Sequence, residues 1–112
     1  MKEAADVLAE SREYIETHGW CRGRMQWEDG SVCSMGAIAY SQHWNNVTLS
    51  PREMVMFQKV CSLLTTLIQN ESQVPGVSIP FWNDVVAKDQ QEVLDMFMKA
   101  EKIARSGNVE ES

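Results

Sequence analysis

Long apolar runs are absent from this chain of 112 residues, and positive charge is scarce. No segment approaches the roughly 20 apolar residues that a helix needs to cross a bilayer, which argues against a membrane-spanning protein. Ten Lys and Arg stand against 16 Asp and Glu, giving a net charge of −6. Direct binding to nucleic acid is therefore not expected, because phosphates require a basic face. The start of the chain is charged and lacks a signal-peptide core, so we expect a cytoplasmic protein.

Cysteine is also sparse, and the motifs of several enzyme classes are missing. Cys21, Cys33 and Cys61 make an odd number, so we expect reduced thiols and no disulfide framework. The sequence contains no glycine-rich phosphate loop, no serine-centred elbow and no paired-carboxylate glycosidase arrangement. Hydrophobic residues still make up 44% of the chain, which suits one globular core. We expect a single compact domain over residues 1–106 and a flexible acidic tail over 107–112.

Helical periodicity and end signals predict about four helices. They span approximately residues 2–18, 34–44, 51–70 and a last segment from about residue 89. Ser50-Pro51-Arg52-Glu53 reads as a capping box with proline at the first helical position. The helix that follows is apolar on most sides, so we expect it at the centre of the fold.

A β-hairpin is predicted over about residues 22–33. Asp29-Gly30 is typical of a two-residue type I′ turn. Such a turn pairs Trp27 with Val32, and Met25 extends the same face, which we expect to contact the core. The predicted fold class is α+β, mostly α, with about four helices around the central helix 51–70 and this one hairpin.

Four tryptophans are many for so short a chain, and three flank turns or helix ends. Trp20 and Trp82 are candidates for a recognition surface. Trp44 falls in residues 31–51, which carry no formal charge and so are either buried or an interface. In the alternative reading Trp82 covers the core, while Asn83 and Asp84 satisfy backbone groups beside the last helix.

Arg22 and Arg24 alternate on the predicted strand, on the same face as Trp20. An arginine beside a tryptophan can grip a phosphate or a flat ring, so these residues are candidates for binding an anionic nucleotide. The alternative is a solvated strand face whose charge is balanced by Glu28 and Asp29.

Cys33 lies just before a predicted helix, where a thiol pKa can fall and reactivity can rise. His43 or His18 could act as its base, with Asp84 as the orienting acid. The alternative is a small buried residue at a close helix contact. Together with Cys21, these Cys and His residues are also ligand types for zinc, but their spacing matches no known zinc motif, so we expect no metal or other cofactor.

Three short motifs give the chain a resemblance to a known family. They are Gly19-Trp20-x-x-Gly23, Cys33-x-x-Gly36-Ala37-Ile38 and Trp82-Asn83-Asp84. This pattern resembles an uncharacterised family of small domains in actinobacteria and their phages, over about residues 3–105. Cys21 and both histidines fall outside the pattern. The family carries no established activity, so the resemblance implies a source and no mechanism.

The leading hypothesis is a non-enzymatic binding protein, such as a phage accessory factor that modulates a host protein through Trp20, Trp82 and residues 31–49. Its acidity favours a basic partner, including a nucleic-acid-binding protein. A homo-oligomer is compatible with the sequence. The alternatives are a binder of an anionic nucleotide at Arg22 and Arg24, and a thiol enzyme centred on Cys33.

Overall fold

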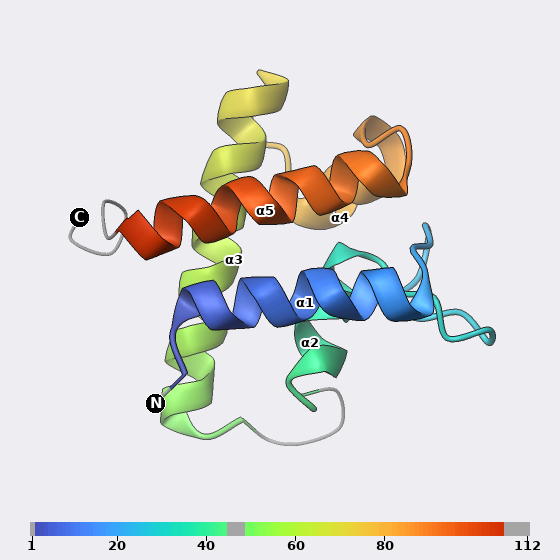
Figure 1. Ribbon diagram of the computed structural model, residues 1–112. Coiled ribbons are helices and arrows are strands. Elements are labelled where there is room, and N and C mark those ends of the chain that lie inside the picture. The colour runs from blue at the N-terminus through green and yellow to red at the C-terminus, as the bar shows by residue number, and fades with distance from the viewer. Residues whose placement is uncertain (1, 45–48, 107–112) are drawn as a thin grey trace.

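The computed structural model describes residues 2–44 and 49–106, and every regular element within them is helical (Figure 1). The elements are α1 (Ala4–His18), α2 (Ser34–Ser41), α3 (Pro51–Ser72), α4 (Ile79–Phe81), the π-helix η1 (Trp82–Val86) and α5 (Gln90–Ser106). None of these helices is long and apolar enough to cross a membrane. The predicted acidic tail, 107–112, lies outside the described residues.

Helices α1 and α5 form the main layer of the molecule. They lie side by side in opposite directions, and α3 crosses behind both (Figure 1). The predicted central position of α3 is wrong, because its first turns are exposed, with Val55 at 64%. From Val60 onward, the apolar residues of α3 recur at the helical spacing that forms a single buried face. That face consists of Val60, Leu63, Leu64, Leu67 and Ile68.

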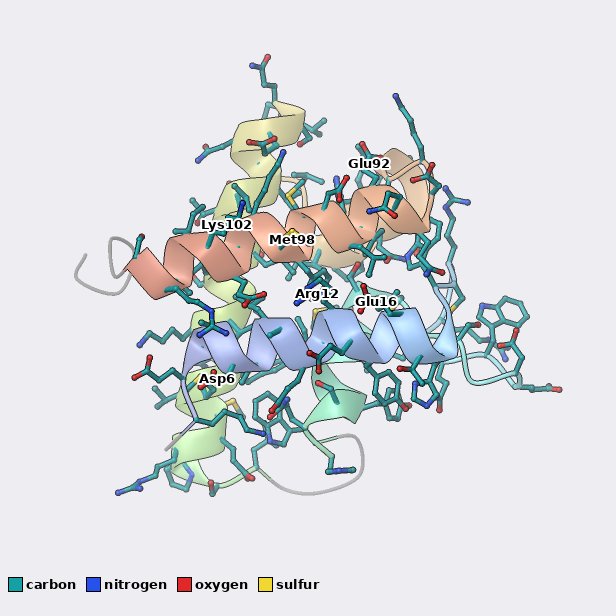
Figure 2. The ribbon with its side chains drawn as sticks, in the orientation of Figure 1. Asp6, Arg12, Glu16, Glu92, Met98 and Lys102 are labelled. Atoms are coloured by element: carbon teal, nitrogen blue, oxygen red, sulfur yellow. The ribbon has the colours of Figure 1, made fainter. Side chains whose placement is uncertain are left out.

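A ladder of alternating charges crosses the seam between α1 and α5. Asp6 pairs with Arg105 at 3.7 Å, and Arg105 pairs with Glu101 at 2.9 Å. Glu101 also contacts Arg12 at 3.5 Å, and Arg12 contacts Glu16 at 3.6 Å. Figure 2 shows Arg12 lying between the two helices. The ladder matches one helix to the other in register, so it favours this pairing over a shifted one.

Local sequence signals place most helix ends correctly. The capping box of α3 is confirmed: the Glu53 backbone N–H donates to Ser50 Oγ at 3.2 Å, and the Ser50 N–H donates to Glu53 Oε1 at 2.9 Å. Before α5, the Glu92 N–H donates to Asp89 Oδ1 at 2.9 Å. Helix α2 begins at the predicted residue, Ser34, and is capped by the preceding Cys33.

The predicted hairpin over 22–33 is wrong, and with it the α+β class. Within the described part of the chain this segment forms no strand and only two isolated bridges. Val32 forms both of them, in parallel with Trp20 and antiparallel with Gln26. The described residues therefore make an all-helical fold with an irregular loop between α1 and α2.

The turn at the tip of this loop is one residue longer than predicted. The Trp27 N–H donates to the Ser31 carbonyl at 2.9 Å, so Trp27 pairs with Ser31 and not with Val32. Gly30 adopts φ 94°, which suits the last position of a three-residue turn. A shift of one residue exchanges the two faces of an extended segment. Trp27 is accordingly 46% exposed and Met25 40% exposed, where the sequence had predicted core contacts.

Candidate functional site

The three motif segments meet at the side chain of Asn83, which is completely buried. Its Oδ1 accepts hydrogen bonds from Trp20 Nε1 at 2.7 Å, from the Ser34 backbone N–H at 2.9 Å and from Ser34 Oγ at 2.7 Å. Its Nδ2 donates to the Cys21 carbonyl at 3.1 Å and to Asp84 Oδ1 at 2.9 Å. The amide is fully satisfied, as a buried polar group must be, so it forms a structural junction.

The π-helix η1 gives Asn83 this position. The Ala87 N–H donates to the Trp82 carbonyl at 2.8 Å, which closes a turn wider than that of an α-helix. Trp82 is only 2% exposed and packs in the core. The predicted reading of Trp82 as a cover of the core agrees with this burial, and the side chain cannot touch a partner in this conformation. Nothing in the sequence pattern had indicated a π-helix here.

Asp84 and Arg22 fasten the loop after α1 to the same π-helix. The Gly23 backbone N–H donates to Asp84 Oδ1 at 3.0 Å. Arg22 Nη2 donates to the carbonyl of Ala87 at 2.6 Å and to that of Lys88 at 3.2 Å. These bonds occupy donors of Arg22 that the anionic-ligand hypothesis had assigned to a phosphate.

Gly36 allows the loop to approach α2 closely. A Cβ atom at this position would collide with the carbonyl oxygen of Met25. Glycine is therefore required here even though alanine is the better helix former. Gly36 and Ala37 belong to one of the three sequence motifs, but the motif does not indicate the segment that Gly36 contacts.

Cys33 serves as the N-cap of α2. Its Sγ accepts a hydrogen bond from the Gly36 N–H at 3.3 Å, and the side chain is 7% exposed. Burial raises the pKa of the Cys33 thiol, so the protonated form is favoured at neutral pH. His43 follows the other end of this eight-residue helix, about 12 Å away at 1.5 Å per residue. The structure does not bring the two residues together as a catalytic pair.

The other proposed ligands do not gather into a metal site. In the described ranges 2–44 and 49–106, no three His, Cys, Asp or Glu side chains gather as a metal site. The His18 ring stacks on Tyr14 with centroids 3.9 Å apart, and its Nδ1 lies 3.1 Å from the Tyr14 carbonyl. Because a carbonyl can only accept, Nδ1 carries the proton in this bond.

The uncharged stretch 31–49 is mostly core where it is described. Its helix α2 buries Ala37 and Ile38 completely, so burial accounts for the lack of charge there. Trp44 is partly buried and packs edge-on against Phe57 at 5.8 Å. It also lines a groove of about 720 Å³ beside the start of α3. Residues 45–48, within the same stretch, lie outside the described residues.

An exposed tryptophan lies in residues 21–30, which we call the Trp27 loop. Trp27 is 46% exposed, yet its Nε1 donates to the Arg22 carbonyl at 2.8 Å. The Arg24 guanidinium lies 4.6 Å from the centre of the Trp27 ring. Two residues away, Met25 is 40% exposed. The loop thus presents an ordered apolar surface to solvent.

Comparison with known proteins identifies a family and no activity. Neither a curated protein nor a solved structure shows a significant match to the chain. A family of unknown function, DUF6197, matches residues 1–103. These residues include the junction at Asn83 and the whole Trp27 loop. The chain therefore belongs to the DUF6197 family of unknown function.

Proposed function

We propose that this protein is a non-enzymatic binding protein that docks onto a partner protein through the Trp27 loop. The proposal rests on the Trp27 side chain, which is both exposed to solvent and held in place by a hydrogen bond. Burying an exposed indole on binding is favourable. A side chain that is already ordered also loses little conformational entropy when it is buried.

The composition of the loop supports the same function. Tryptophan, arginine and methionine are enriched at the centres of protein interfaces. In this loop Arg24 stacks on Trp27, and Met25 is also exposed. Trp20 holds Arg22 in place: the Arg22 guanidinium stacks on the Trp20 ring at 4.5 Å, and the Trp20 indole is bonded to Asn83. In this proposal Trp20 and Asn83 support the surface, and Trp27 makes the contact.

The setting of this function follows from the sequence resemblance and the charge. We place the protein in the bacterial cytoplasm as an accessory factor, encoded by an actinobacterium or its phage, that modulates a host protein. The net charge of −6 favours a basic partner, including a nucleic-acid-binding protein, by steering their encounter. The charges within the loop are balanced, with Arg22 and Arg24 against Glu28 and Asp29, so the negative field arises from the rest of the chain.

The test is retention of a host protein by matched variants. Tagged wild-type protein, Trp27→Ala and Phe81→Ala are incubated with lysate of an actinobacterial host. Phe81 is a suitable control because it is an exposed aromatic of similar accessibility, at 48%. We expect a stoichiometric partner that wild type and Phe81→Ala retain and that Trp27→Ala loses. Equal retention by all three folded proteins would contradict the proposal, as would the absence of any specific partner.

A further inference from the structure

The exposed Trp27 indole is held by a residue that is itself anchored elsewhere. Trp27 Nε1 donates to the backbone carbonyl of Arg22 at 2.8 Å. The side chain of Arg22 donates in turn to the carbonyls of Ala87 at 2.6 Å and Lys88 at 3.2 Å, just after η1. Arg22 therefore connects the indole to the end of the π-helix, with its backbone on one side and its guanidinium on the other.

The guanidinium is fixed on a second side as well. It lies 4.5 Å above the ring of Trp20, whose own Nε1 is bonded to the buried Asn83. Carbonyls at the end of a helical segment lack partners within the helix and attract a cationic donor. The side chain of Arg22 is thus confined between a fixed ring and two fixed carbonyls.

We infer that Arg22 is the positioning residue of the Trp27 surface. Its guanidinium clamps the loop to the end of η1, so its carbonyl oxygen stays where it can hold the Trp27 indole. The effect on binding rests on the proposed function, whereas the positioning of Trp27 requires no partner. Arg24 stacks on Trp27, but none of the described contacts ties its side chain to η1.

The experiment measures order at the Trp27 indole in the free, full-length protein. The heteronuclear nuclear Overhauser effect and the hydrogen-exchange rate of the indole N–H are compared in wild type, Arg22→Met, Arg22→Lys and Arg52→Met. Methionine keeps an unbranched stem that can cover Trp20 but has no donor. Lysine keeps a donor for the Ala87 carbonyl. Arg52 is an exposed arginine on α3 and serves as the matched control.

We expect Arg22→Met to lower the heteronuclear effect at Trp27 and to speed indole exchange about tenfold, the consequence of losing its fixed acceptor. Arg22→Lys should restore part of the order, and Arg52→Met should match wild type. Unchanged Trp27 order in folded Arg22→Met would overturn the inference. Equal loosening of all four indoles would also overturn it, because general destabilisation has that effect. If Arg22→Met does not fold, Arg22→Leu, which likewise has no donor, is judged by the same two criteria.

The same variants separate this inference from the proposed function. In the capture experiment, Arg22→Met should retain less of the partner than wild type, and Arg52→Met should retain as much. If Trp27→Ala loses no partner, the proposed function fails while the order measurement still decides the role of Arg22. If Trp27→Ala loses a partner and Arg22→Met does not, the surface binds without the clamp, and the inferred effect of Arg22 on binding is overturned.

Discussion

Trp20 Nε1 donates a 2.7 Å hydrogen bond to the buried Oδ1 of Asn83, 63 residues further along the chain. The same oxygen accepts two bonds from Ser34, at the start of α2. The three motif segments that carry the family resemblance therefore share one amide group. We interpret this junction as the support of the Trp27 loop, because its polar atoms bond to one another and not to an open site.

The junction predicts a large cost for removing the Asn83 amide. Asn83→Ala leaves the Trp20 indole, the Ser34 N–H and the Cys21 carbonyl without their buried partner. We expect the free energy of unfolding to fall by about 3 kcal/mol or more. Urea unfolding followed by circular dichroism measures it, with Asn70→Ala, at an exposed position of α3, as the control. Equal stability of the two variants would refute the junction.

Gly36→Ala should destabilise the protein although alanine favours helices by about 1 kcal/mol over glycine. The added Cβ meets the Met25 carbonyl, which is backbone and cannot rotate away. We expect a net loss of about 2 kcal/mol in the free energy of unfolding. Gly23→Ala is the comparison, since a Cβ there meets no atom within 4 Å and only its φ of 88° is unfavourable. A stabilising Gly36→Ala would show that the loop does not approach α2 this closely.

Cys33 should behave as a cap and not as a nucleophile. Cys33→Ser keeps an acceptor for the Gly36 N–H and should remain folded, whereas Cys33→Ala should lose about 1 kcal/mol of stability. At about pH 7.5 a buried thiol stays protonated and is therefore unreactive. In the native protein at this pH, iodoacetamide should label Cys33 no faster than the chain unfolds. Mass spectrometry of digested protein measures the rate. Rapid native labelling would instead favour the thiol-enzyme alternative.

Stability should fall as the pH rises through the alkaline range because of Cys61. Burial raises the pKa of this thiol from its ordinary 9.0 to about 11 in the folded protein. Between these values the unfolded chain releases the proton and the folded protein keeps it, so higher pH favours unfolding. Urea unfolding from pH 8 to pH 11, approximately the span of the two pKa values, should show a shallower decline for Cys61→Val. Identical slopes for both proteins would contradict the assignment.

The helices could be predicted because their signals are local. The capping box at Ser50 and Glu53 and the cap at Asp89 both lie within four residues of the groups they bind. The true, partly exposed position of α3 could not be predicted from its composition, since Met54 and Val55 are apolar and yet exposed. Hydrophobicity alone does not say which neighbour is present to cover a residue.

The prediction of a hairpin over 22–33 was wrong for a different reason. A single extra residue in the turn changes the pairing of Trp27 and exchanges its face, and Asp29-Gly30 fits either turn length. Trp27 is accordingly exposed where core contacts were predicted, whereas Trp82 is buried, in agreement with its reading as a cover of the core. The motif resemblance selected the residues that gather at Asn83. It could not indicate the bonds among them, because these span segments far apart in sequence.

Hydrogen exchange at the four tryptophan indole N–H groups of the unmodified protein directly tests the junction at Asn83. We expect the Trp20 indole, bonded to buried Asn83, to exchange only as fast as the slowest amides of α1 and α5, which report global unfolding. The Trp27 indole should exchange much faster, through local opening of its exposed loop. A Trp20 indole that exchanges as fast as that of Trp27 would contradict the junction on which the presentation of the loop depends.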